Sequence, residues 1–244
     1  MSSKSTLRLD WCSYAAAKYA VEHWHYSRRM PRSKLAKLGV WEDEQFIGVV
    51  IFGMGASDSL GVRYGLTETQ CCELVRIALT QHRTPVSRIV SIALSILHRE
   101  YHGLRAVVSF ADTAQNHHGG IYQGSNWFYL GRTAQSDEWL IQGKHYHGRG
   151  FRKLLEGTRW TSLRGMTTAQ KAVALDPNAT RLKGSVKHRY LYPLDDEMRL
   201  QIAPLAKPYP KRPRAESIEG DAPTFHVGED GPLPISALQE TAAA

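Results

Sequence analysis

The segment of residues 104–132 constrains the fold most, because two apolar runs in it enclose a group of titratable side chains. The first run contains Val107, Val108 and Phe110 and is typical of a buried strand. The second run, Trp127–Leu130, is aromatic and precedes Gly131. An acid directly after a buried strand lies at the sheet edge where α/β proteins bind ligands. The sequence therefore predicts an α/β fold with a reaction site formed by the polar residues between the runs, Asp112, Asn116, His117, His118 and Tyr122.

Length and composition indicate one globular domain with appendages. The chain has 244 residues, of which 42% are hydrophobic. Because no apolar run approaches the roughly 20 residues of a membrane span and no apolar signal core begins the chain, we expect a soluble intracellular protein. The three cysteines, Cys12, Cys71 and Cys72, have no disulfide or metal-knuckle spacing and are expected to be buried free thiols.

The net charge of +8 is concentrated in one segment. Residues 144–189 contain eleven Lys and Arg against two acids, a net +9, so the rest of the chain carries about −1. Such a segment favours a nucleic-acid partner, with a solvated basic face as the alternative. The cations expected to contact phosphates are Lys144, Arg149, Arg152, Lys153, Lys187 and Arg189.

The order of predicted elements indicates a mixed sheet flanked by helices. A helix capped by Asp10 is followed by a hairpin (38–41 and 45–54), a strand (71–79), a helix begun by Thr84 and Pro85, the strand of the first apolar run, a short helix, a strand near 138–141, a helix at 167–175 and a strand at 187–192. This order is similar to the GNAT acetyltransferase fold, which implies a strongly twisted mixed α/β sheet. The expected domains are a GNAT-like catalytic core (1–143), a basic DNA-contacting extension that completes the domain (144–204), and a disordered tail (205–244).

The motif by which GNAT enzymes bind acyl-CoA, Q/R-x-x-G-x-G/A, is absent from residues 82–87. This absence argues against acyl-CoA as the cofactor. The start of the following helix, with Ser87 and Arg88, still offers free N–H groups to an anion and is the expected cofactor-binding position.

Four segments resemble the Mom DNA-modification proteins of Mu-like phages. They are LRLDWCSYAAAKYAVEHWHYSRRMP, CELVRIALTQHRTPVSRIV, VSFADTAQNHHGGIYQGSNWFYLGRT and KHRYLYPL, in this order within residues 5–194. The resemblance implies a GNAT-like transferase in the host cytoplasm that converts the exocyclic amine of adenine in DNA to an N6-carbamoylmethyl derivative and so protects phage DNA from restriction. The implied partners are double-stranded DNA and an unidentified small-molecule or carrier-bound group donor. A homodimer is left open.

Four residues of the central part of the chain are candidates for catalysis. Asp112 is expected to act as a general base or metal ligand, and its structural alternative is a helix N-cap. Tyr122 is expected to donate a proton to the leaving group, or else to be a buried tyrosine with a bonded hydroxyl. Ser109 is placed at the pocket wall or in the core. Glu73 and Arg76 lie at an odd separation in one strand, so they are expected to face opposite sides of the sheet. One of the two, with Arg76 favoured, is expected to reach the pocket, and the alternative is a paired charge at a sheet edge.

The HWHYS block at the end of the first helix supplies further candidates. His25 is expected to be a base or metal ligand with Tyr26 beside it, and the alternative for His25 is a helix C-cap. Arg28 and Arg29 are expected to bind phosphate. A two-His-one-carboxylate iron site is one further hypothesis, with the ligands His25, Asp112 and His117.

Modification of a paired adenine is expected to require base extrusion, with Trp24, Tyr26 or Trp127 as pocket walls. Core packing explains the two tryptophans equally well. Two other functions stay open: an acyl-CoA-dependent acetyltransferase acting on protein or RNA, and a non-enzymatic DNA-binding antirestriction protein.

Overall fold

The computed structural model describes residues 6–54, 60–135, 137–147 and 165–211, which form two compact units. The first unit takes the described residues up to Phe110, His118–Gly131 and those from Arg189 onward. The second takes Ala111–His117 and the described residues of Arg132–His188. None of the described helices is long and apolar enough to span a membrane.

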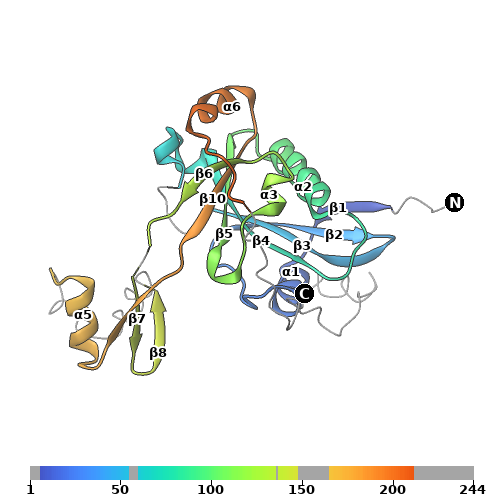
Figure 1. Ribbon diagram of the computed structural model, residues 1–244. Helices are drawn as coiled ribbons and strands as arrows, with labels where there is room; N and C mark the ends of the chain where they lie inside the picture. Colours follow the sequence, from blue (N-terminus) through green and yellow to red (C-terminus); the bar gives the residue numbers. More distant parts are fainter. Residues whose placement is uncertain (1–5, 55–59, 136, 148–164, 212–244) are drawn as a thin grey trace. The chain divides into compact units, whose positions relative to one another are not determined.

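A seven-stranded sheet organises the chain, with the strand order β1-β2-β3-β4-β5-β10-β6 (Figure 1). Strands β1 to β4 pair antiparallel with their neighbours, whereas β4 and β5 are parallel. The predicted mixed α/β class with a helix-flanked sheet is therefore confirmed. The strands are β1 (Leu7–Trp11), β2 (Leu35–Glu42), β3 (Gln45–Gly53), β4 (Cys71–Leu79), β5 (Ala106–Asp112), β6 (Phe128–Arg132) and β10 (Lys187–Pro193).

Two helices, α1 (Tyr14–Trp24) and α2 (Val86–Glu100), lie on opposite faces of the sheet (Figure 1). The buried side of α1 packs in a core cluster with Phe46, Val49 and Ile51 of β3. Helix α2 buries residues spaced three and four apart, as a one-sided helix must: Ile89, Val90, Ala93, Leu94 and Leu97. The short helices are α3 (Gly120–Gln123) and α6 (Asp196–Ile202).

The predicted start of the first helix was wrong. Asp10 lies in β1, opposite Gly39 of β2, and Ser13 caps α1 by accepting a hydrogen bond from the Ala16 amide at 3.1 Å. The alternation in LRLDW is typical of a half-exposed strand, but it is only five residues long, and the N-cap signal of Asp10 was given more weight. The prediction of buried thiols is confirmed for Cys71 and Cys72, and Cys12 is half-buried.

The second unit contains a three-stranded sheet in the order β8-β7-β9. Its elements are β7 (Asp137–Ile141), β8 (Lys144–His147), α5 (Thr168–Leu175) and β9 (Thr180–Lys183). Trp139, Ile141 and Ala172 form its core, so α5 packs on β7. The strand near 138–141 and the helix at 167–175 are confirmed, whereas β8 and β9 were not predicted. Residues 212–244 of the predicted tail lie outside the described residues.

Candidate active site at the β4–β5 opening

The parallel strands β4 and β5 pair over only three residues and then part. Their register runs from Cys71–Ala106 to Glu73–Val108, although β4 continues to Leu79 and β5 to Asp112. The Leu74 carbonyl, one residue beyond the last pair, accepts a hydrogen bond from the Ser109 hydroxyl at 2.9 Å. A side chain thus satisfies a buried backbone acceptor just beyond the paired stretch. We call this place the β4–β5 opening.

Tyr122 of α3 points its hydroxyl at the opening. Its Oη lies 2.7 Å from Ser109 Oγ, and Ser109 is only 1% exposed. Because the Leu74 carbonyl can only accept, Ser109 donates its one proton there and accepts from Tyr122. The orientation of the tyrosine O–H is therefore fixed within a chain of two hydrogen bonds.

Burial raises the pKa of Tyr122 to about 12. The charges of Tyr26, Glu73 and Tyr190 add to this shift, because each disfavours a phenolate at Tyr122. At neutral pH the phenol is therefore protonated and able to donate. The same interactions identify Glu73 and Tyr190, together with the predicted Tyr26, as neighbours of Tyr122.

Aromatic rings hold Tyr122 in place. Its ring centroid lies 5.0 Å from those of Trp127 and Tyr190. The Tyr190 hydroxyl donates to the His118 carbonyl at 2.6 Å and accepts from Gln123 Nε2 at 3.2 Å. Such offset ring contacts with satisfied hydroxyls fix a side chain in one position.

Gly119 makes this packing sterically possible. It has a φ of +82°, and a Cβ atom at this position would lie 2.3 Å from the Tyr190 ring. Only glycine fits, because it tolerates positive φ and has no side chain. The adjacent glycines Gly119 and Gly120 were the available sequence signal. They did not identify this contact, because the sequence does not show that the Tyr190 ring packs beside them.

Glu73 and Arg76 do not face opposite sides of the sheet, so that prediction was wrong. The β3–β4 register pairs Gly53 with Glu73 and Ile51 with Arg76, which leaves Val75 as an extra residue in β4. Because of this bulge, the side chains of Glu73 and Arg76 lie on the same face of the sheet, since their partners in β3 are two residues apart. Arg76 Nη1 donates to the Val75 carbonyl at 2.6 Å, and its buried Nε has no hydrogen-bond partner within the described residues.

His25 ends α1 and binds the loop that follows. Its Nδ1 accepts from the Ser27 backbone amide at 3.1 Å and lies 2.9 Å from the Ser27 hydroxyl. Because an amide can only donate, neutral His25 carries its proton on Nε2. The Tyr26 ring packs on His25 with the ring centroids 4.3 Å apart, and Tyr26 is 57% exposed, whereas Trp24 and Trp127 are buried in the core.

Asp112 and His117 belong to the second unit. Asp112 accepts from the Ala114 amide at 3.0 Å, as an N-cap does, and forms an ion pair with Lys187 at 3.5 Å. His117 is exposed, and its amide donates to the Asp112 carbonyl at 3.1 Å. Across the part of the chain that the structure describes, no three His, Cys, Asp or Glu side chains gather as a metal site, so the iron hypothesis gains no support.

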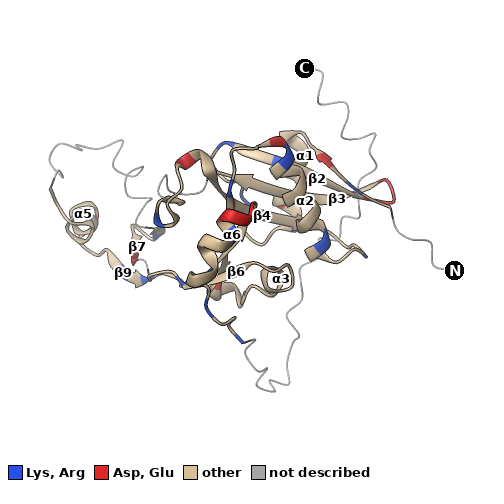
Figure 2. Cartoon of the chain, turned by 90° about the horizontal axis from the view of Figure 1, so that it is seen from above, with Lys and Arg blue, Asp and Glu red and all other residues tan. Residues whose placement is uncertain are grey.

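Lys and Arg residues occur in both units (Figure 2), and the predicted nucleic-acid contacts also fall in both. Arg28 and Arg29 are exposed after α1, Lys144 is exposed in β8, and Arg189 lies over the Phe110 ring at 5.8 Å. Arg149, Arg152 and Lys153 lie outside the described residues.

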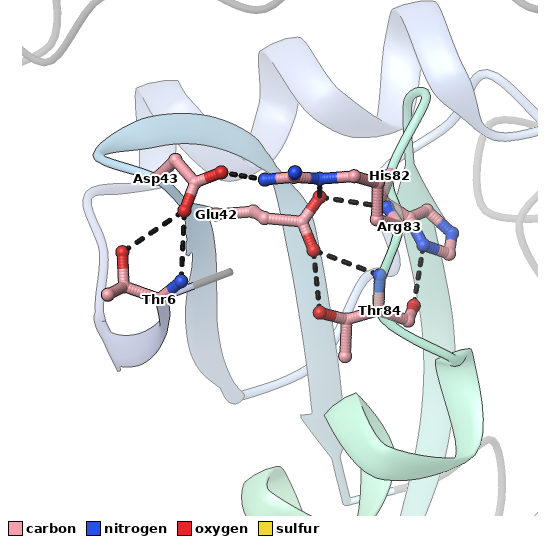
Figure 3. A network of polar contacts seen from close by, with 6 residues as sticks. All are labelled: Thr6, Glu42, Asp43, His82, Arg83 and Thr84. Carbon is pink, nitrogen blue, oxygen red and sulfur yellow. Dashed lines mark hydrogen bonds and ion pairs between the residues drawn. The ribbon is translucent and has the colours of Figure 1, made fainter. Parts of the chain in front are cut away.

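The turn between β4 and α2 is already bonded to a carboxylate. Glu42, only 6% exposed, accepts from the amides of Arg83 at 2.8 Å and Thr84 at 2.9 Å, and from the Thr84 hydroxyl at 2.6 Å (Figure 3). The next residue, Pro85, has no N–H. Ser87 and Arg88 lie in the first turn of α2, half-buried and exposed respectively. A second anion at this turn would meet a negative charge and only the remaining N–H groups.

Comparison with known proteins places these features in a family. The family model described as "Mom protein family" matches residues 6–211. The protein named methylcarbamoylase Mom of Escherichia phage Mu is 31% identical over 145 residues, which cover 58% of this chain and 60% of the phage protein. The family match spans both units and includes every described strand and helix. The chain therefore belongs to the Mom protein family.

Proposed function

We propose that this chain is a GNAT-like transferase that modifies phage DNA by converting the exocyclic amine of adenine to an N6-carbamoylmethyl derivative, which protects the DNA from host restriction. The observation that carries the proposal is the family match over residues 6–211, together with the name of the phage Mu relative. The β4–β5 opening supplies the place for the chemistry. The protein acts inside the host cell, where its DNA substrate lies.

The strand arrangement supports the GNAT-like assignment. The order β1-β2-β3-β4-β5-β10-β6 places a C-terminal strand between β5 and β6, and the central parallel pair opens after three residues. Ligands of α/β proteins bind where neighbouring strands diverge. The unit formed by β7, β8, α5 and β9 is an insertion between β6 and β10.

The reaction forms a bond between adenine N6 and the methylene carbon of the transferred group. N6 loses a proton, and the bond from the methylene carbon to the leaving group breaks as that group takes a proton. Adenine's amine is a poor nucleophile because its lone pair is delocalised into the ring. A base beside N6 and a donor beside the leaving group each contribute roughly 10²–10⁴-fold.

Tyr122 is the proton donor in this scheme, because its raised pKa keeps the phenol protonated. In this step its O–H turns from Ser109 to the leaving group. Glu73, whose charge acts on Tyr122, is a candidate base in addition to Asp112. The contact of His25 Nδ1 with Ser27 favours a donor role for His25 Nε2 over a basic one.

The group donor is not held through a diphosphate at the turn before α2. The hydrogen bonds of Glu42 to Arg83 and Thr84 support this, because they use the amides that would bind phosphate oxygens. Acyl-CoA does not fit this turn, and no step of the scheme depends on it.

Nucleoside mass spectrometry on DNA from cells expressing the chain tests the proposal. We expect deoxyadenosine carrying a carbamoylmethyl group and DNA that resists restriction. Glu73→Gln and Asp112→Asn then identify the base as the residue whose amide variant loses the adduct. Unmodified adenine in cells with ample folded protein would contradict the proposed activity.

A further inference from the structure

A basic hollow lies between the start of α1 and the beginning of β2. It has a volume of about 580 Å³ and is lined mainly by Tyr14, Pro31, Arg32, Lys34 and Lys37. This volume falls within the range of ligand pockets, roughly 300–1,000 Å³. All of its lining residues belong to the first unit. None of its lining residues belongs to the segment 144–189, in which the sequence concentrates positive charge.

The charge of the hollow is not neutralised by neighbouring acids. Residues 28–37 contain five Lys and Arg and no Asp or Glu. No ion pair among the described residues involves any of these five cations. The first turn of α1 has no acid either, so the positive end of the helix dipole adds to the field. This combination favours a polyanion.

Tyr14 gives the hollow an aromatic surface. It is 56% exposed although it begins a helix with a well-packed opposite side, and Arg32 and Lys34 beside it are exposed. A phenol ring among cations suits a nucleic-acid strand, whose bases stack on aromatic rings while its phosphates contact Lys and Arg. An acidic peptide offers the charge but not the stacking bases.

The loop that lines the hollow belongs to the same chain segment that borders the candidate active site. The loop that lines it starts after Tyr26, whose charge contributes to the raised pKa of Tyr122. Within that loop the Arg29 carbonyl accepts a hydrogen bond from Arg76 Nη2 of β4 at 3.5 Å. A strand bound in the hollow would therefore run beside the β4–β5 opening.

We propose that this hollow binds the DNA strand next to the target adenine, with its phosphates on Arg32, Lys34 and Lys37 and one flanking base stacked on Tyr14. The proposal rests on the proposed function, because it takes DNA as the substrate. It adds a second DNA contact surface to the one predicted in the basic segment 144–189.

Fluorescence anisotropy with a labelled DNA duplex, repeated over a range of salt concentrations, tests this proposal. Each phosphate contact contributes about 0.9 to the slope of log affinity against log salt concentration. The triple variant R32A/K34A/K37A should lower the slope by about 2–3, with roughly tenfold or greater loss of affinity near 0.1 M salt. The double variant R32A/K34A, which leaves the half-buried Lys37 intact, should lower the slope by about 2.

Matched variants separate this surface from a general effect of charge. R63A/R99A/R199A removes three exposed cations of the same unit outside the hollow and should leave the slope unchanged. Tyr14→Phe should bind as the wild type does, whereas Tyr14→Ala should lose roughly 5- to 100-fold through lost stacking.

The outcomes distinguish the two proposals. If the wild type modifies and binds DNA but the hollow variants keep its salt slope and affinity, the hollow is not a DNA site. The same conclusion follows if R63A/R99A/R199A loses as much affinity and slope as R32A/K34A/K37A. If the folded wild type neither binds nor modifies DNA, the proposed function fails together with the hollow.

Discussion

At the scale of single residues, the Tyr122 hydroxyl links pH to stability. Its folded pKa of about 12 exceeds the ordinary value of 10.0, so folding favours the protonated phenol. The contribution to stability is complete below about pH 10 and is lost as the pH rises toward 12, because the unfolded chain ionises first. Its size is about 2–3 kcal/mol. Urea unfolding of the wild type should therefore show a decline in stability over this pH window that is smaller in Tyr122→Phe.

The control for this prediction is Tyr101→Phe, which removes the hydroxyl of a tyrosine that is 46% exposed. It should retain the alkaline decline of the wild type. An equal decline in Tyr122→Phe would show that the Tyr122 phenol is not the titrating group.

Gly119 is the second residue on which the site depends. Gly119→Ala should destabilise the fold by more than about 1 kcal/mol, because it strains a positive φ and drives a methyl group into the Tyr190 ring. Thermal unfolding measures this. Gly143 also has a positive φ, but no atom lies near its Cβ position, so Gly143→Ala measures the backbone strain alone. Gly103 has neither a positive φ nor a nearby atom, so Gly103→Ala should leave stability unchanged. Equal effects for Gly119→Ala and Gly143→Ala would show that the contact with Tyr190 is unimportant.

At the scale of elements, Glu42 joins the end of β2 to the turn before α2. Glu42→Ala would leave two amides and a hydroxyl without their acceptor, with an expected loss of about 2–5 kcal/mol in the free energy of unfolding. Chemical denaturation measures it, and Glu44→Ala, which changes an exposed residue of the same hairpin, should alter the free energy of unfolding little.

The same turn gives a prediction for ligand binding, because its amides are already bonded to Glu42. Calorimetry should detect no saturable binding of acetyl-CoA to the wild type. Binding that shifts the amide resonances of Arg83 and Thr84 would contradict the role of Glu42.

The sequence predicted elements well where the signal was local. The Thr84–Pro85 start and the apolar stripe of α2, the hairpin around Glu42 to Glu44 and the strand β5 were all found. It failed where contacts between distant segments decide the outcome. The bulge at Val75 exists because β3 and β4 pair out of register there, and it moves Arg76 to the face that alternation assigns to Glu73.

At the scale of the whole molecule, the site too could be predicted from the sequence only where its residues are close together in the chain. Residues 104–132 contain Tyr122 and Ser109, so the sequence identified two members of the opening. Glu73 and Tyr190 come from strands far away in the chain, and only the strand order brings them to Tyr122. The capping alternative for Asp112 could be stated from the sequence, and the contact with Ala114 has that form.

The most direct test of Tyr122 as the proton donor at the β4–β5 opening is the rate at which modified deoxyadenosine accumulates in DNA after induction of wild type, Tyr122→Phe and Tyr101→Phe at equal protein levels. We expect carbamoylmethyl adducts for the wild type and Tyr101→Phe, and a rate lower by roughly 10²–10⁴-fold for Tyr122→Phe. A folded Tyr122→Phe protein that modifies adenine as fast as the wild type would contradict this role, because the β4–β5 opening would then not be the site of the chemistry.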